Sequence, residues 1–340
     1  MKRSRVTGAF LALAVALVAR PAPTAALVIH GDTDATVNPL AYTQRPADDP
    51  GWDYIGATGA GTAVYLGNGY VLVPKHFTPG STLDLPGGSF AFDSSFAPVD
   101  LTNPDPGEGT PDLRIFRILD APALEPLSIR TTSPTRGGPP GRNPPTALIL
   151  IACGRARNTE LLLFGDFHGY ATSTARQRAW GENTVSDNTS LATLGACSTY
   201  AFRSAFDETF GDAQAVQNDS GSGAFTFNPD AGRWELAGAV VGVVACDADL
   251  TRALIGNQVI MADLSIYRDQ INAIVSEPIP DPVPGDADGD GDVDLDDFVI
   301  LKTNFGCAAN ATWAMGDFDG DGDVDLDDFV LLKANFGITG

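Results

Sequence analysis

The feature that most constrains how this chain can fold is a duplication near its C-terminal end. Residues 285–306 (GDADGDGDVDLDDFVILKTNFG) return 31 residues later as residues 316–337 (GDFDGDGDVDLDDFVLLKANFG), and the two segments differ at only three positions. Random substitution does not preserve both the aspartate spacing and the apolar positions of a segment unless both are needed. The duplication therefore predicts a small unit built from two similar halves.

A proline-rich stretch separates this unit from the rest of the chain. Residues 277–284 (EPIPDPVP) alternate prolines with other residues, which favours an extended, semi-rigid linker. Just before it, apolar residues at helical spacing predict a helix over 262–276. We therefore expect a large domain over 27–276 and a C-terminal domain over 285–340.

The larger domain has the composition of an all-β protein. The chain contains 37 glycines and 24 prolines, and its apolar runs are short, as in 61–73 (GTAVYLGNGYVLV) and 234–246. Short strands punctuated by turn residues are typical of barrels and sandwiches. With 44% hydrophobic residues, the chain has enough apolar side chains for a sizeable core.

Residues 1–26 have the pattern of a secretory signal peptide. Three basic residues at the start precede an apolar run over 9–19 and small residues over 22–26. The apolar run is too short to span a bilayer, so a membrane anchor is the less favoured alternative. We expect a secreted protein, extracellular or at the cell surface, without a membrane span. Its four cysteines then permit disulfides in three full pairings.

The net charge of −22 is unevenly distributed. Residues 281–340 contain 15 aspartates and two lysines and so carry −13 of it. An acidic block of this kind argues against nucleic acid as a partner and for cation binding.

The aspartates of each repeat are spaced as the ligands of a calcium loop. Aspartate or glycine occupies positions 1, 3, 5, 6, 9 and 12 of an EF-hand-type loop, with a backbone carbonyl at position 7. The alternative, an acidic solvating tail, does not need this register. We therefore expect two Ca²⁺ ions, and none for catalysis. The predicted ligand residues are Asp286, Asp288, Asp290, Asp292, Asp294 and Asp297 in the first loop, and Asp317, Asp319, Asp321, Asp323, Asp325 and Asp328 in the second.

Two details distinguish these loops from an EF-hand. Position 12 is aspartate instead of glutamate, and the prolines leave no room for a helix before the first loop. In both respects the repeats resemble type I dockerin repeats, each a loop followed by one helix, here over 295–305 and 326–336. The resemblance implies a calcium-dependent domain that tethers the chain to a cohesin-like protein partner. The helices should pack through Phe298, Ile300, Leu301 and Phe305 against Phe329, Leu331, Leu332 and Phe336.

Three residues of the larger domain have the setting of a hydrolytic triad. His76 follows the strand pair of 61–73, Asp112 begins an alternating apolar strand, and Ser220 lies in a glycine-rich loop (QNDSGSGAF) before a buried strand. Peptide hydrolysis by a serine needs a base to take its proton and a carboxylate to orient that base. His168 has no comparable setting, and we expect it in a surface loop.

The order and setting of these three residues resemble the trypsin/chymotrypsin type of serine protease, over roughly residues 28–276. The resemblance implies two packed six-stranded antiparallel Greek-key barrels, a serine endopeptidase acting on polypeptide substrates, and His76, Asp112 and Ser220 as catalytic residues. It also implies an oxyanion hole formed by the backbone N–H groups of Asn218 and Ser220. Two departures are Asn218, where the family has glycine, and Pro74-Lys75, where it has small residues.

The same resemblance suggests a substrate pocket. Gln214 stands where members that prefer Arg or Lys have an aspartate, and Val241 and Val243 replace residues that line the pocket. A small apolar residue before the scissile bond is therefore expected. The resemblance also implies that Asp219 pairs with a freed N-terminal amine, which a cut near Ala26 would supply.

Two rival functions remain open from the sequence. One is a catalytically inactive protease fold that acts as a binding module. The other is a surface or scaffold protein in which the dockerin-like part is the main function.

Overall fold

The computed structural model describes most of the chain. The described residues are 27–31, 40–139, 143–163, 166–247, 249, 251–276 and 283–339. The expected signal peptide, 1–26, lies outside the described residues, as does most of the expected linker. Within these described ranges no helix is long and apolar enough to cross a membrane.

A seven-stranded antiparallel sheet forms the first half of the β-rich part. Its members are β2 (Ile55–Thr58), β3 (Gly61–Gly67), β4 (Tyr70–Val73), β5 (Thr82–Leu85), β6 (Gly88–Ala91), β7 (Val99–Asp100) and β8 (Arg114–Arg117), in the spatial order β6-β5-β2-β3-β4-β8-β7. Asn68 and Gly69 both have positive φ, 50° and 79°, and make the tight hairpin between β3 and β4. Both strands of this hairpin are buried along their whole length.

The second half closes into a six-stranded antiparallel barrel. Its strands are β9 (Ala147–Ala152), β12 (Ala179–Leu194), β13 (Cys197–Ala205), β15 (Gly223–Asn228), β16 (Arg233–Val244) and β18 (Gln258–Asp263), in the order β12-β13-β18-β16-β15-β9. Leu148, Leu150, Phe202, Val240 and Met261 are among the apolar side chains that form one core cluster of this region. Alternate side chains of a strand face opposite sides, so each strand contributes every second residue to such a core.

Shorter elements surround these two units. The remaining strands are β1 (Val28–Ile29), which pairs with β14 (Ala213–Gln214), and β10 (Arg155–Leu163), β11 (Asp166–Arg176) and β17 (Arg252–Leu254), which form a three-stranded sheet. The 3-10 helices are η1 (Leu40–Thr43), η2 (Trp52–Tyr54), η3 (Pro106–Glu108) and η4 (Trp313–Met315). Helix α1 (Leu264–Val275) lies within the predicted helical segment and buries Leu264, Tyr267 and Ile271.

The structure confirms a mostly β protein with antiparallel sheets, but only one of the two expected six-stranded barrels closes. In the first half an isolated bridge joins Phe92, just after the edge strand β6, to Ile118, just after β8. The edge strands β6 and β7 have four and two residues and do not pair with each other. The first half is therefore a seven-stranded open sheet.

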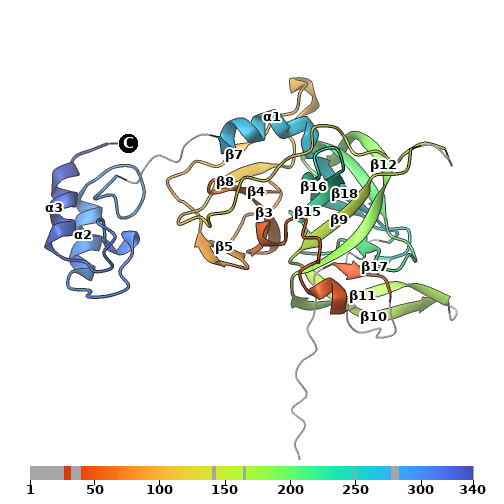
Figure 1. Cartoon of the computed structure of the whole chain (residues 1–340), viewed down its shortest axis with the longest axis horizontal. Coiled ribbons are helices and arrows are strands. Elements are labelled where there is room, and N and C mark those ends of the chain that lie inside the picture. The colour runs from red at the N-terminus through yellow and green to blue at the C-terminus, as the bar shows by residue number, and fades with distance from the viewer. Residues whose placement is uncertain are drawn as a thin grey trace, which may run out of the picture.

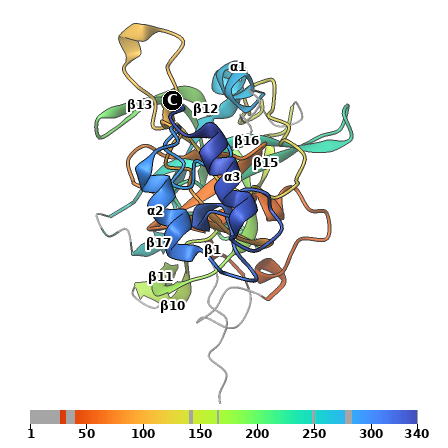
Figure 2. The same ribbon diagram turned by 90° about the vertical axis from the view of Figure 1, so that its left-hand side faces the viewer.

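The duplicated segment forms two similar helices, α2 (Leu295–Asn304) and α3 (Leu326–Asn335), which lie side by side (Figure 2). Figure 1 shows them at one end of the drawn chain, apart from the strands. Each helix begins at a capping box, in which the side chains at the N-cap and three residues later bond each other's backbone N–H groups.

The core between these helices differs in part from the prediction. Phe298 and Phe329 contact each other with ring centroids 6.1 Å apart, and Leu301 and Leu332 are buried. Phe305 and Phe336 were expected in the core, but each is 50% exposed. Both helices end one residue before the phenylalanine, whose extended backbone ends the run of residues on the packed face. The other buried members of this core are Ala287, Val293, Phe318 and Val324.

The structure describes all four cysteines, and each is a free thiol. Of the alternatives left open by the sequence, none of the disulfide pairings is formed.

Candidate active site

The pairing of two strands brings His76 and Asp112 together. His76 follows the end of β4, Asp112 precedes the start of β8, and these antiparallel strands pair through Val73 and Arg114. Residues just beyond such a pair lie at the same end of the sheet. The backbone N–H of His76 donates to one carboxylate oxygen of Asp112 at 2.8 Å, and its Nδ1 lies 2.6 Å from the other.

Ser220 comes to the same place from the other half of the molecule. It lies in the loop between β14 and β15, and its Oγ is 3.1 Å from Nε2 of His76. The backbone N–H of Thr62, on β3, donates to the carbonyl of Ser220 at 2.9 Å. Asp112 is only 1% exposed, and its backbone N–H donates to Oγ1 of Thr199 on β13 at 2.9 Å. The three side chains thus form one hydrogen-bonded row at the junction of the sheet and the barrel.

The loop around Ser220 has an unusual backbone. Asn218 has φ of 78° and Gly221 has φ of 89°, both in the left-handed region. A Cβ at Gly221 would lie 1.8 Å from the carbonyl oxygen of Thr62, so only glycine fits there. Within the described residues, the backbone N–H groups of Asn218 and Ser220 donate no hydrogen bond. Two such donors are what a developing oxyanion needs.

Asp219 lies beneath this loop and is fully buried. Its carboxylate accepts the N–H of Val216 at 2.8 Å, and the nearby backbone N–H groups of Leu27 and Gly154 act to lower its pKa. Burial raises the pKa of Asp219 to about 8. The segment Leu27–Ile29 is itself fully buried, because β1 pairs with β14 directly before the loop.

A cavity of about 390 Å³ opens beside Ser220. Val241 and Val243 line it, but Gln214 does not; the Gln214 side chain is fully buried and donates to the carbonyl of Ala215. The other lining residues are His76, Asp112, Leu194, Gly195, Ala215, Val216, Gln217, Asn218, Val240, Gly242 and Arg252. The walls are thus mostly small and apolar.

Arg252 is the charged residue of the lining that sequence reasoning missed. It forms ion pairs with Asp247 at 3.3 Å and Asp249 at 3.0 Å. It reaches the cavity through β17, whose partner β11 lies about 80 residues earlier, so no local sequence pattern marks it. His168 is exposed, as predicted, but it lies on strand β11 and not in the expected loop.

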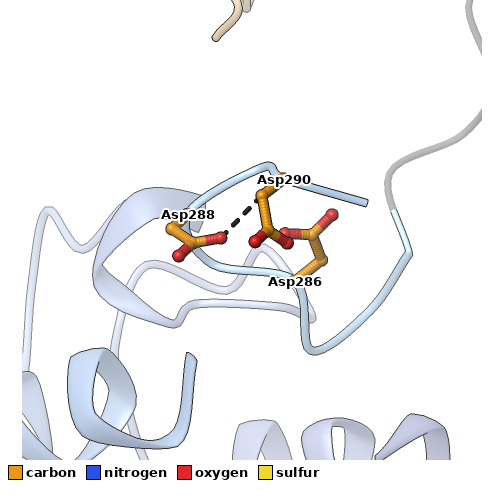
Figure 3. A group of neighbouring side chains, drawn as sticks. All are labelled: Asp286, Asp288 and Asp290. Atoms are coloured by element: carbon orange, nitrogen blue, oxygen red, sulfur yellow. Dashed lines mark hydrogen bonds between the residues drawn. The ribbon is translucent and has the colours of Figure 1, made fainter. Parts of the chain in front are cut away.

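The aspartates of the two repeats gather into candidate metal sites. Figure 3 shows the side chains of Asp286, Asp288 and Asp290 along one loop. Each of four groups of carboxylates has oxygens within 4.8 Å of one another. The groups are Asp286, Asp288 and Asp290; Asp292, Asp294 and Asp297; Asp317, Asp319 and Asp328; and Asp323, Asp325 and Asp328. Of the twelve predicted ligand residues, only Asp321 falls outside them.

The loop backbone is already folded around the first aspartate. The N–H groups of Gly289 and Gly291 donate to Asp286 at 2.7 and 3.1 Å, and those of Gly320 and Gly322 donate to Asp317 at 2.8 and 3.0 Å. Burial, and then the neighbouring carboxylates, raise the pKa of Asp286. Crowded carboxylates that supply only oxygen ligands fit a hard cation.

Comparisons with known proteins give distant structural likenesses. No protein-family model matches this chain, and no curated protein matches its sequence. One similar solved structure is the passenger domain of Plasmid encoded toxin, an autotransporter enterotoxin from enteroaggregative Escherichia coli. Its TM-score is 0.43 with 12% identity, and the match covers 64% of this chain and 22% of that one.

Another similar solved structure is a mutant of human heparin binding protein (CAP37). Its TM-score is also 0.43, with 13% identity over 71% of this chain and 98% of that chain. This chain spans less than a quarter of the toxin passenger domain but nearly the whole length of the heparin binding protein. Likenesses this distant assign no activity to the chain.

Proposed function

We propose that the β-rich part is a serine endopeptidase of the chymotrypsin type. The observation that carries this proposal is the row formed by Asp112, His76 and Ser220, with distances of 2.6 Å and 3.1 Å between the reacting atoms. A base within hydrogen-bond reach of the nucleophile, itself oriented by a buried carboxylate, is the geometry that activates a serine.

The chemistry follows from these positions. Nε2 of His76 accepts the hydroxyl proton as Oγ of Ser220 attacks the scissile carbonyl carbon. Asp112 holds the imidazole in place and stabilises its positive charge. The N–H groups of Asn218 and Ser220 donate to the oxygen that becomes negative. His76 then gives its proton to the leaving amine, and water releases the acyl group by the same steps in reverse order.

The cavity beside Ser220 supports a small apolar residue before the scissile bond. Val241 and Val243 narrow it, and most of its other walls are alanine, glycine, leucine or valine. Arg252, at the lining, is paired with Asp247 and Asp249, so neither of these carboxylates is left free to pair with a basic substrate side chain.

The C-terminal domain is proposed to bind two Ca²⁺ ions and to tether the chain to a cohesin-like protein partner. The two loops of aspartates would hold the ions, which would neutralise carboxylates that otherwise repel one another. The proposed layout is a signal peptide over 1–26, the protease over 27–276, a linker over 277–284 and the tethering domain over 285–340, in a secreted protein.

Labelling with a fluorophosphonate tests the activity directly. Ser220 displaces fluoride from phosphorus and becomes covalently marked, whereas Ser220→Ala cannot react. Absence of labelling in the wild-type chain would favour the rival function, an inactive protease fold that binds a partner. A pull-down with a cohesin-like protein, with and without calcium, tests the tether separately.

A further inference from the structure

The backbone of Asn218 presents a problem that the proposed activity has to solve. Its φ of 78° lies in a region that glycine enters freely and in which a residue with a Cβ is strained. The Asn218 N–H points correctly for an oxyanion only while this conformation lasts. Something must therefore hold Asn218 in place.

Both ends of the Asn218 side chain are hydrogen-bonded. Its Oδ1 accepts a hydrogen bond from Nε of Arg155 at 3.0 Å, and its Nδ2 donates to the carbonyl oxygen of Ala60 at 2.5 Å. The Asn218 backbone carbonyl also accepts from Oγ1 of Thr62 at 3.3 Å. The residue is thus fixed on one side by β3 and the turn before it, and on the other by Arg155.

The position of Arg155 is itself fixed by close packing. The residue before it, Gly154, presses against the loop: a Cβ there would lie 2.0 Å from Oδ1 of Asp219 and 2.8 Å from the carbonyl carbon of Asn218. Arg155 starts β10 and pairs with Arg176 on β11. The Arg176 side chain in turn donates to the carbonyl of Cys153 at 3.1 Å, which holds the same turn.

We propose that Arg155 is a positioning residue of the oxyanion hole: it holds the Asn218 side chain so that an asparagine can do what a glycine does freely. This inference rests on the proposed protease function. Arg155 touches neither the reacting atoms nor Ser220 in this arrangement; its effect reaches the reaction through the backbone N–H of Asn218.

The test is the second-order rate of fluorophosphonate labelling of Ser220 in the full chain. Arg155→Ala should slow labelling at least about tenfold, because loss of one oxyanion donor costs about 10²–10³ in kcat. Asn218→Ala should slow labelling to a similar extent, since alanine cannot form the side-chain hydrogen bonds of asparagine and lacks the backbone freedom of glycine. Asn218→Gly should label at close to the wild-type rate. Arg233→Ala is the matched control and should not change the rate, because Arg233 is exposed at the start of β16 and does not line the cavity beside Ser220.

The decisive variant combines Asn218→Gly with Arg155→Ala. Without an asparagine to hold, the loss of Arg155 should change the rate by less than about twofold, a non-additive result that a general structural role does not give. Equal slowing by Arg155→Ala in both backgrounds, or no slowing in either, overturns the inference, as does a poorly reactive Asn218→Gly. Thermal melting checks that each variant is folded. A wild-type chain that is not labelled at all refutes the proposed function itself, which is a separate outcome.

Discussion

The β-rich part and the C-terminal domain bring their functional residues together in opposite ways. His76 is 36 residues from Asp112 and 144 from Ser220, so these side chains meet only when the sheet and the barrel have both formed. In the C-terminal domain, all the candidate ligand residues of one loop fall within residues 286–297. A turn of the backbone is enough to bring those carboxylates together.

The two sites therefore depend on different interactions. The triad row depends on long-range pairing and on a large apolar core, and among its residues none is a candidate metal ligand. The acidic loops depend on whether their charges are neutralised, because their core is small. Damage to one region should therefore leave the other intact, and the predictions below test that separation.

The largest effect is expected from loss of the nucleophile. Ser220→Ala should lower kcat by about 10⁶, as removal of a triad serine does, while leaving calcium binding unchanged. His76→Ala should be similarly damaging, and the exposed His168→Ala should not be. Peptide hydrolysis and calorimetric calcium titration measure the two properties. Activity of Ser220→Ala within tenfold of wild type would refute the assignment of the nucleophile.

Removal of calcium should have the next largest effect, and only on the C-terminal domain. The fourteen aspartate carboxylates of the two loops repel one another when no cation is bound. Lys302 and Lys333 are the only positively charged side chains of residues 285–340 that can offset this repulsion. Circular dichroism of residues 285–340 should show most of the helix signal lost in EDTA and regained with excess Ca²⁺. Equal helix content in both conditions contradicts the proposal. Hydrolysis by the full chain should persist in EDTA.

The acidic loops could be predicted from the sequence more fully than the surroundings of the triad. The spacing of Asp286 and its neighbours predicted the loops, because ligand spacing is a local property, and each helix begins directly after its capping aspartate. The mostly β class and the strand pair β3–β4 also followed from strand patterns. The exposure of Phe305 and Phe336 did not, because it depends on where the helices end.

The residues around the triad could be predicted less well from the sequence. Arg155 is 63 residues from Asn218, the residue that it contacts, and Arg252 lies on β17, whose partner β11 comes much earlier in the chain. Only the folded topology therefore brings these arginines to the Ser220 loop and its cavity. The burial of Gln214 has the same cause, since β14 is covered by the N-terminal strand β1.

The start of the mature chain should affect stability in a pH-dependent way. Burial raises the pKa of Asp219 to about 8. When no positive charge lies beside this carboxyl group, the folded state keeps a proton that the unfolded state has released. The free energy of unfolding therefore falls as the pH rises from about 4 to 8. A chain cut after Ala26 places the α-amine of Leu27 beside this carboxylate and should reverse the penalty. Asp212, whose pKa is also raised to about 8 by burial, is common to both forms and cancels.

Melting temperatures of two chains measure this effect. One begins at Leu27, and the other retains additional residues before it. The chain beginning at Leu27 should lose less stability between pH 5 and pH 8, by a few degrees in Tm for about 1 kcal/mol. Parallel pH profiles for both chains would show that Asp219 does not pair with the terminus.

Among the effects on activity, the smallest is expected in substrate selection, which depends on the cavity beside Ser220 and not on the triad. Peptides with alanine or valine before the scissile bond should be cleaved at least about tenfold better than the same peptide with arginine, since pocket differences of this kind are worth about 1–3 kcal/mol. Arg252→Ala removes the cation from the lining and leaves Asp247 and Asp249 without their partner. The ratio of kcat/KM for the arginine peptide to that for the alanine peptide should therefore rise several-fold, while Arg233→Ala leaves it unchanged. Efficient cleavage after arginine by the wild-type enzyme would contradict the proposed pocket, and an unchanged ratio in Arg252→Ala would show that this guanidinium does not act on the substrate.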